Sequence, residues 1–290
     1  MVSIITINYN GWKDTCELIA SLMQYETYPF EVIVVDNASK GDDVDRIQNA
    51  YPNVTVVSSD INLGFAGGNN LGYQHAKGDY IFFLNNDMVI KSAILKPLVV
   101  CLLNENIGAV SPSVYYLYNS EQVQYYGYKK LGKITLRHQT EAYHPSKKDR
   151  LLVSHETDGL YGGAMMARKD VIELVGKMTE VFFLFAEEFD WSNRIREGGF
   201  KIWYEADSVV YHKGGSSIGY GTPLRAYYMS RARMLYARRN NKGRIKLLSC
   251  MYLLVVSMTK NVLIASLNKD WKRVKALFQG TFHGLIDKIK

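Results

Sequence analysis

Three stretches decide the fold of this chain: VSIITINYNG at residues 2–11, VIVVDNAS at 32–39 and GDYIFFLNND at 78–87. Each contains a continuous apolar run, which is typical of a strand buried on both faces, followed by asparagine or aspartate. Apolar residues at helical spacing lie between the first two, from about Asp14 to Gln24. This alternation predicts an α/β fold with a mainly parallel sheet that helices cover on both faces.

The same alternation extends outward from these stretches. Residues 113–158 differ, because they hold seven of the 21 tyrosines and few aliphatic runs; they predict hairpins or a long loop and no separate domain. The carboxylate-rich segment Phe185–Arg196 comes later, and the chain is expected to be helical from Leu224 onward. Further strands are expected at Val54–Ser58, Lys201–Tyr204 and Ser208–Tyr211, further helices at Asp43–Ala50 and Gly67–Ala76, and strand and helix signals at Tyr161–Ala167 and Asp170–Val175.

Composition and charge narrow the class of protein. The 290 residues are 47% hydrophobic and 22% charged, which excludes wholesale disorder. Three cysteines without a C-x-x-C pair argue against a disulfide framework or a structural zinc site and favour a reducing cytosol, and no signal peptide is recognised. The net charge is −6 over residues 1–110, zero over 111–220 and +13 over 221–290. Unless it is simply a solvated helix, this basic end favours an anionic partner, either membrane or nucleic acid.

Polar residues follow the predicted strands at the edge where parallel sheets bind ligands. Asn8–Asn10, Asp36 and Asn85–Asp87 all fall at this edge. A carboxylate such as Asp36 can accept the ring N–H of uracil or thymine, although aspartate in VVDNAS can also cap a helix. The glycine-rich segment Asn62–Gly72 permits close backbone approach to a ribose or diphosphate, although alone it is only a loop.

These motifs together resemble the family 2 glycosyltransferases of the GT-A fold, most closely the bacterial rhamnosyltransferase-like branch that builds surface polysaccharides. Besides the opening stretches, the resemblance rests on NLGFAGGNNLG (62–72), GLYGGAMMARKDV (159–171), FFLFAEEFDWSNRIREGGFKIWY (182–204) and VVYHKGGSS (209–217), in family order. It implies a GT-A catalytic domain over 1–222, with a nucleotide-binding half at 1–110 and an acceptor and catalytic half at 111–222. Residues 223–290 are then a basic amphipathic helical extension.

The resemblance also implies a nucleotide and metal site. Asn85-Asn86-Asp87 takes the place of the family's D-x-D motif, so Asp87 would bind Mg²⁺ or Mn²⁺ directly, with His212 completing the metal or diphosphate site. The alternatives are an Asx-turn and a structural histidine. By the same resemblance, the residues near the nucleotide are Asp36, which holds the base, and Asn8, Asn10, Asn62, Gly64, Asn70 and Asn86.

A second acidic cluster, Glu187, Glu188 and Asp190, matches the family's E-D-x-D region and reads E-E-F-D here. Inverting transfer needs a base to take the proton of the acceptor hydroxyl, and adjacent carboxylates raise one another's pKa toward neutrality. The resemblance makes Glu188 the base and Glu187 the alternative base, although the family usually has aspartate at position 188. The structural interpretation is a helix N-terminus rich in acids.

The resemblance also places the loop with Gly162 and Gly163 beneath the donor sugar, with Asp158 contacting sugar or acceptor hydroxyls. The alternative for this loop is a simple hairpin turn.

The resulting hypothesis is an inverting glycosyltransferase that uses dTDP-rhamnose or a UDP-hexose and a glycan acceptor carried on a lipid. One alternative is a non-enzyme that binds nucleic acid or a membrane surface, but no nucleic-acid motif is recognised, so no nucleic-acid partner is expected. Another is a sugar-nucleotidyltransferase, which would need an N-terminal glycine-rich loop with arginine and lysine. The sequence fixes neither the donor sugar nor the acceptor and linkage.

The basic extension contains an apolar run of twelve residues, Leu247–Met258, broken only by Ser249 and Ser257. A membrane span needs about 20 residues, so the run is expected to be too short, and Lys260 interrupts its continuation. An apolar helix flanked by basic residues is typical of an interfacial segment on anionic lipid. The alternatives are packing on the catalytic domain or a homodimer. The resemblance favours a cytoplasmic enzyme held peripherally on the inner face of the plasma membrane.

Overall fold

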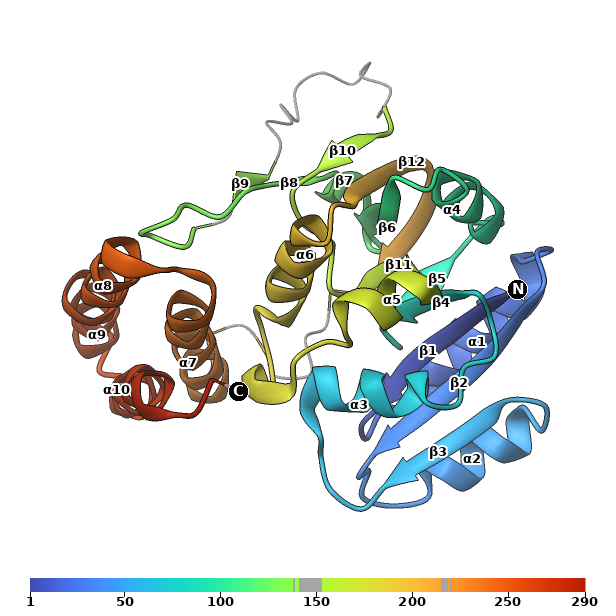
Figure 1. Ribbon diagram of the computed structural model, residues 1–290. Helices are drawn as coiled ribbons and strands as arrows, with labels where there is room; N and C mark the ends of the chain where they lie inside the picture. Colours follow the sequence, from blue (N-terminus) through green and yellow to red (C-terminus); the bar gives the residue numbers. More distant parts are fainter. Residues whose placement is uncertain (138, 141–152, 215–218, 220, 290) are drawn as a thin grey trace.

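The computed structural model describes residues 1–137, 139–140, 153–214, 219 and 221–289. Its strands are β1 (Val2–Asn8), β2 (Phe30–Asn37), β3 (Thr55–Ser59), β4 (Tyr80–Leu84), β5 (Met88–Ile90), β6 (Ile107–Tyr116), β7 (Asn119–Tyr125), β8 (Tyr128–Lys129), β9 (Gln139–Thr140), β10 (His155–Thr157), β11 (Ala164–Arg168) and β12 (Lys201–His212). Ten of them form one sheet in the order β10-β12-β6-β11-β4-β1-β2-β3, with β5 paired to β12 and β7 to β6 (Figure 1).

Helices cover both faces of this sheet. They are α1 (Trp12–Tyr25), α2 (Asp43–Ala50), α3 (Gly64–Tyr73), α4 (Leu95–Leu102), α5 (Lys169–Val175) and α6 (Glu187–Glu197). The chain ends with α7 (Pro223–Asn240), α8 (Gly243–Met251), α9 (Met258–Leu267) and α10 (Trp271–Ile286). One hydrophobic cluster joins α1, α2 and α4 to one face, and a second joins α3, α5 and α6 to the other. Neighbouring strand residues alternate between the clusters: Ile4 and Phe82 belong to the first, Ile5 and Phe83 to the second.

The predicted α/β architecture is confirmed. The β1–β2, β1–β4, β2–β3 and β6–β12 pairs are parallel, whereas β11 runs antiparallel to both of its neighbours. The predicted helix at Asp43–Ala50 and strand at Tyr80–Leu84 have the observed bounds. The remaining predicted elements in the first third of the chain occur within a few residues of their expected limits.

Two predictions about strands were wrong or incomplete. Lys201–Tyr204 and Ser208–Tyr211 belong to one strand, β12, because a register shift between Glu205 and Val209 absorbs the polar interruption. The first half of β6 was not predicted at all. This strand crosses residue 110, so the two expected halves of the catalytic domain share it.

The tyrosine-rich segment contains the expected hairpin, since β6 and β7 pair antiparallel. The small pair β8–β9 follows it. The rest of the predicted loop at 141–152 lies outside the described residues.

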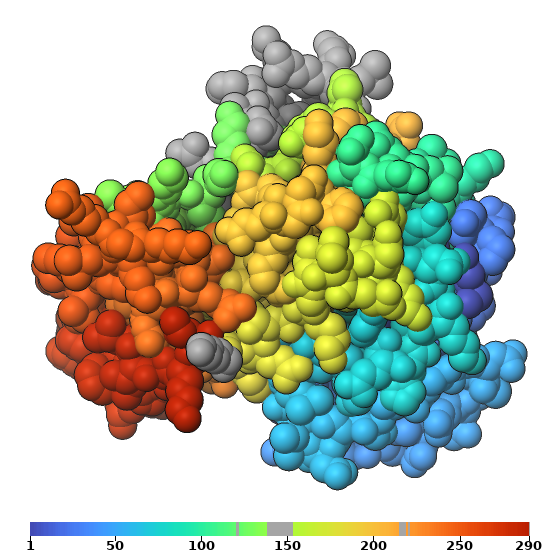
Figure 2. Space-filling view, in the orientation of Figure 1, coloured from blue at the N-terminus to red at the C-terminus, as the bar shows by residue number. Residues whose placement is uncertain are grey.

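The C-terminal helices form a lobe beside α6, at the left of Figures 1 and 2. Helix α7 packs on the catalytic domain through a cluster that includes Phe182 and Leu235. Leu253 belongs to the same cluster and lies in the apolar run, for which packing on that domain is one of the alternatives. From Gly243 to Leu267 the chain is one helical run of 25 residues, because a π-helical segment at Tyr252–Ser257 joins α8 to α9. By length and composition this run could cross a membrane, so the expectation that the segment is too short was wrong for the helix as a whole.

Candidate active site

A chain of hydrogen bonds joins the carboxyl ends of β1, β2 and β4. The Asn8 side-chain amide donates to Asp36 Oδ1 at 2.8 Å and to Asp43 Oδ2 at 3.0 Å. The Thr15 hydroxyl donates to Asn8 Oδ1 at 2.8 Å, and the Asn86 amide donates to Thr15 Oγ1 at 3.1 Å. Asn8, Asp36 and Asn86 therefore meet at one edge of the sheet, as the sequence predicts.

Asp36 is 5% exposed, and its second oxygen accepts the backbone N–H of Ser39 at 3.1 Å. This bond closes a turn and caps no helix, since Asp42 is the residue that precedes α2. Asp43 is also buried at this edge, and the sequence did not reveal it because acids are common in the first turn of any helix. The edge is thus preorganised around two buried carboxylates.

The other predicted nucleotide residues occupy two places. Asn10 is exposed at the edge, where its side-chain oxygen accepts Lys40 N–H at 2.7 Å. Asn62 accepts Gly64 N–H at 2.9 Å, and Gly64 adopts a φ of +71° with the Phe183 carbonyl only 2.3 Å from where a Cβ would stand. Position 64 therefore requires glycine for close packing against the segment that precedes α6.

Asn70 does not join this chain of contacts. It is 4% exposed, and its amide donates to the Met178 carbonyl at 2.8 Å and to Glu180 Oε1 at 2.9 Å. These bonds tie α3 to the segment at 178–180. Its contact with a nucleotide stays a prediction.

Asp87 and His212 are 125 positions apart and meet beside the pairing of β5 with β12. His212 Nε2 lies 3.0 Å from Asp87 Oδ2, and Asp87 Oδ1 is buried with no hydrogen-bond partner in the described part of the chain. A carboxylate oxygen and an imidazole nitrogen side by side suit Mn²⁺ or Mg²⁺, and the orphaned oxygen supplies one further donor. The residues present therefore fit a divalent metal.

Gln124 completes this arrangement, and sequence analysis missed it. Its side-chain oxygen lies 2.8 Å from His212 Nδ1. A proton held on Nδ1 by this oxygen leaves Nε2 free to bind a metal. Within the described residues no group of three or more His, Cys, Asp or Glu side chains is arranged to hold a metal.

Helix α6 begins after a strained segment. Phe183, Phe185 and Ala186 have φ values of 64°, 70° and 71°, a region that residues other than glycine rarely adopt. Such strain persists where the surrounding fold enforces it, and it often occurs at functional sites. Here it sets the position of the first turn of α6, which carries Glu187 and Glu188.

The two glutamates have different surroundings. Glu187 is 3% exposed, one of its oxygens has no partner among the described residues, and burial together with the charge of Glu188 raises its pKa well above the usual range. Glu188 is half-buried, and burial raises its pKa to about 7. The protonated form of Glu187 is therefore favoured, whereas Glu188 can take up or release a proton near neutral pH.

Glu188 also faces the predicted sugar loop. A Cβ added to Gly162 would lie 3.5 Å from Glu188 Cδ, so the carboxyl group stands directly over this glycine. The neighbouring Gly163 carbonyl accepts Asn85 N–H at 2.9 Å, which attaches the loop to the Asn85–Asp87 triplet. The structure thereby brings the Glu188 region, the glycine loop and the metal-binding candidates together.

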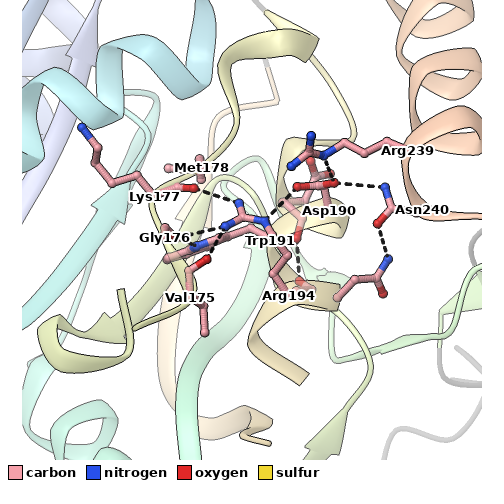
Figure 3. Close-up of polar contacts among 12 residues, drawn as sticks. Val175, Gly176, Lys177, Met178, Asp190, Trp191, Arg194, Arg239 and Asn240 are labelled. Atoms are coloured by element: carbon pink, nitrogen blue, oxygen red, sulfur yellow. Dashed lines mark hydrogen bonds and ion pairs between the residues drawn. The ribbon is translucent and has the colours of Figure 1, made fainter. Parts of the chain in front are cut away.

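Asp190, the third predicted catalytic acid, pairs with arginines of α6 and α7. It is 1% exposed; its two oxygens pair with Arg194 at 3.1 Å and Arg239 at 2.8 Å, and Asn240 donates to it at 3.0 Å (Figure 3). Arg194 in turn donates to the carbonyls of 175–177 (Figure 3). These contacts make Asp190 the joint between α6 and α7. Its predicted catalytic role is unsupported by this geometry.

We expect Asp190→Asn to lower the free energy of unfolding by about 3 kcal/mol, since it leaves two partly buried arginines without a carboxylate. Urea unfolding measures the loss. The matched control is Asp170→Asn, because the Asp170 side chain is 67% exposed and its pair with Arg168 should contribute about 0–1 kcal/mol. Equal stability of the two variants would contradict the structural role of Asp190.

Asp158 pairs with Arg196 at 2.9 Å and accepts Lys130 N–H at 2.9 Å. Its side chain is 42% exposed. The contacts fix its position at the end of α6, and a role with sugar or acceptor hydroxyls stays a prediction.

Comparisons with known proteins identify the family of this chain. Residues 3–176 match the family described as glycosyl transferase family 2. The dTDP-rhamnosyl transferase RfbF of Shigella flexneri is 26% identical over 281 residues, which cover 92% of this chain and 88% of that protein. The N-acetylglucosaminyl-diphospho-decaprenol L-rhamnosyltransferase of Mycobacterium tuberculosis is 22% identical, covering 75% of this chain and 78% of that protein.

Among solved structures, the mannosyltransferase PcManGT from Pyrobaculum calidifontis, in complex with GDP-Man and Mn²⁺, has a TM-score of 0.61 at 16% identity. The match covers 99% of this chain and 87% of that one, and it supports the GT-A fold. The matched residues 3–176 contain the opening strands and the Asn85–Asp87 triplet, and the fold match extends over α6 and β12. The chain therefore belongs to glycosyl transferase family 2.

Proposed function

We propose that this glycosyltransferase inverts the anomeric centre of a nucleotide-sugar in a single displacement, with Glu188 as the base. The observation that carries the proposal is the position of Glu188 over Gly162, in the loop that contacts the Asn85–Asp87 triplet. A carboxylate with a pKa of about 7 is suited to accept a proton near neutral pH. No covalent intermediate on the enzyme is needed.

The remaining residues bind and orient the donor. Asp36 and Asn8 hold the nucleotide base at the ends of β2 and β1, and the segment Asn62–Gly72 approaches the ribose or diphosphate. Asp87 and His212 hold the divalent metal, Mg²⁺ or Mn²⁺. When bound, the metal neutralises negative charge on the leaving diphosphate. Gln124 keeps the His212 ring in the orientation that this requires.

The donor we propose is a pyrimidine diphospho-sugar, with dTDP-rhamnose and UDP-hexoses as the leading candidates. A buried carboxylate such as Asp36 can accept the ring N–H of thymine or uracil, and the similar protein from Shigella is a dTDP-rhamnosyl transferase by name. We expect a screen by nucleotide release with Mn²⁺ present to give turnover with one of these donors. Turnover with GDP-mannose alone would contradict the proposed choice of base.

The acceptor we propose is a glycan carried on a lipid diphosphate. The similar mycobacterial rhamnosyltransferase acts, by its name, on a sugar linked to decaprenol through a diphosphate. The C-terminal lobe offers matching chemistry, since residues 221–290 carry a net charge of +13 and the run Gly243–Leu267 is apolar and only 11% buried over its most apolar window.

The same features support cytoplasmic localisation with peripheral attachment to an anionic membrane, while a homodimer through these helices remains the competing proposal. We expect the full-length protein to float with anionic liposomes and to be released by salt, because basic residues flank the apolar surface. Leu263→Asp with Leu267→Asp should abolish flotation, as these side chains are 59% and 75% exposed. The control is Leu174→Asp, at a 70% exposed leucine of α5. Wild-type protein that stays at the bottom contradicts the proposal, and retention through a salt wash indicates a span.

A further inference from the structure

A cavity of about 230 Å³ lies inside the C-terminal lobe and shares no lining residue with the edge of the sheet that carries Asp36 and Asp87. Helices α7, α9 and α10 and the π-helical segment enclose it. Three arginines line it: Arg225 and Arg233 from α7, and Arg273 from α10. Hydroxyl groups from serine and threonine stand among them. None of the described residues in its lining is an aspartate or a glutamate.

The guanidinium groups of two of these arginines, Arg233 and Arg273, donate to no carboxylate among the described residues. Arg233 donates to Ser257 Oγ at 3.0 Å and to the Thr135 carbonyl at 2.7 Å, both uncharged oxygens, and burial together with the charge of Arg137 holds its pKa below the usual range. Arg273 Nε is buried with no hydrogen-bond partner in the part of the chain that the structure describes. Partly buried cations without a carboxylate partner attract an anion, so Arg233 and Arg273 make the cavity suitable for one.

The donors in the cavity suit a phosphate group. A guanidinium presents paired N–H donors that match phosphate oxygens, and arginine is the side chain best suited to such recognition. Arg225 lies in the first turn of the 18-residue α7, where the helix dipole adds partial positive charge. A diphosphate can engage arginines from both α7 and α10, whereas a single charge would leave part of the cluster uncompensated.

An exposed apolar surface adjoins the cavity. Leu253 and Ser257 line the cavity while the neighbouring Leu254 and Val255 are 37% and 60% exposed. On α10 the same relation holds, because Leu277 lines the cavity and Phe278 is 47% exposed. An anion with an attached hydrocarbon chain could bury its charge among the arginines and lay its chain on these helices.

The cavity is also connected to the catalytic region. The Arg225 guanidinium lies 5.0 Å from the centroid of the Phe185 ring, in the strained segment just before Glu187. From the next turns of α7, Arg231 donates to the carbonyls of Val181 and Phe182 at 3.0 Å. The helix that lines the cavity therefore also holds the segment that positions Glu188.

We propose that this cavity binds the diphosphate of an isoprenoid-linked acceptor, with the isoprenoid chain on the exposed faces of α8–α10. The inference rests on the proposed function, which it deepens by giving the lipid carrier of the acceptor a site of its own. Arg225, Arg233 and Arg273 bind the diphosphate, and the attached glycan extends past Phe185 toward Glu188.

Calorimetric titration with farnesyl diphosphate in EDTA tests the proposal, since EDTA removes metal-assisted diphosphate binding at Asp87 and His212. We expect the wild-type protein to bind farnesyl diphosphate more tightly than inorganic pyrophosphate, because the chain adds apolar burial. The double variant Arg225→Gln/Arg273→Gln should weaken binding by about tenfold or more. Arg225→Lys/Arg273→Lys keeps the charge and should retain part of the affinity.

Lys272→Gln is the matched control, because Lys272 is an exposed cation next to Arg273 on α10 and lines no part of the cavity. Its affinity for farnesyl diphosphate should stay at the wild-type value, and thermal unfolding should show all variants folded. If pyrophosphate binds as tightly as farnesyl diphosphate, the lipid part of the proposal is wrong. If the Arg225→Gln/Arg273→Gln variant binds like the wild type, the site is wrong.

The titration needs no donor and no turnover, so its outcome is independent of whether the proposed transfer reaction holds. In a transfer assay with a diphospholipid-linked acceptor, the single variant Arg273→Gln should raise the KM for acceptor while kcat and donor binding stay close to wild type, because Arg273 lies on α10 and it is Arg225 that contacts Phe185. An effect on kcat alone would overturn the assignment as an acceptor site.

Discussion

Glu188→Gln should reduce sugar transfer by about 10²–10⁴-fold, the usual contribution of a general base. The substitution keeps the shape of the side chain over Gly162 but removes the proton acceptor. Donor binding should survive, because Glu188 contacts none of the residues at the Asp36 edge. Steady-state rates and calorimetric titration with the nucleotide measure the two effects separately.

Two neighbouring glutamates provide controls for this prediction. Glu197→Gln changes an exposed glutamate at the far end of the same helix and should leave the rate unchanged. Glu187→Gln should have a smaller effect than Glu188→Gln, because burial and the charge of Glu188 raise the pKa of Glu187 well above the usual range, and glutamine resembles the protonated carboxyl group that this favours. If Glu187→Gln abolishes transfer and Glu188→Gln does not, the two roles must be exchanged.

The pH dependence follows from the same carboxyl group. A base must be deprotonated to act, and burial raises the pKa of Glu188 to about 7, so kcat/KM should rise with pH and level off above about 7. The stability of the fold should change with pH in the opposite direction to the rate. Burial makes the folded state bind the proton more tightly than the unfolded state, so stability should fall as pH rises from about 4.5 to about 7. Rate profiles and urea unfolding across this window check both directions.

Asp87→Asn should abolish metal-dependent nucleotide binding. Asp87 is the only acid of the Asn85–Asp87 triplet, and its buried Oδ1 has no hydrogen-bond partner among the described residues. The loss of affinity should exceed the about 10–100-fold that accompanies removal of a partner outside the metal's own ligands. Calorimetric titration with dTDP or UDP in the presence of Mn²⁺ measures it.

The control for this variant is Asp79→Asn, at an aspartate whose side chain is 81% exposed and which precedes β4, at the end of the strand opposite to Asp87. Wild-type protein in EDTA should resemble Asp87→Asn, because both lack the metal. His212→Ala should lower the affinity for Mn²⁺ in the presence of nucleotide. Unchanged nucleotide affinity in Asp87→Asn with Mn²⁺ present would overturn the assignment of the metal site.

The pattern of apolar and polar residues was sufficient to predict those strands and helices whose apolar residues recur at a regular period. The runs VSIITI, VIVV and YIFFL predicted buried strands because both faces of each strand are covered, and they also located Asn8, Asp36 and Asn86 at one edge. Parallel strands place their carboxyl ends together whatever the details of packing. That is why this part of the site could be anticipated.

Where apolar residues do not recur at a regular period, the sequence did not predict the strand. The strand β6 contains Gly108, Ser111, Pro112 and Ser113, which interrupt any apolar period, yet it is central in the sheet. Pro112 faces Glu205, where the register of the β6–β12 pairing shifts. The same shift lets β12 continue through a polar stretch that reads as a break between two strands. Register depends on the partner strand, which the sequence of one segment does not contain.

The sequence by itself determined the order of strands and helices, the polar edge of the sheet and, through family motifs, the positions of Glu188, Asp87 and His212. Only the tertiary structure decided which groups surround these residues. It joined Gln124 to His212, which lie 88 positions apart, and it placed Asp190 between α6 and α7, where Arg194 and Arg239 pair with it. It also raised the pKa of Glu188 to about 7, because burial of a carboxylate results from the packing of distant segments around it and not from its sequence neighbours.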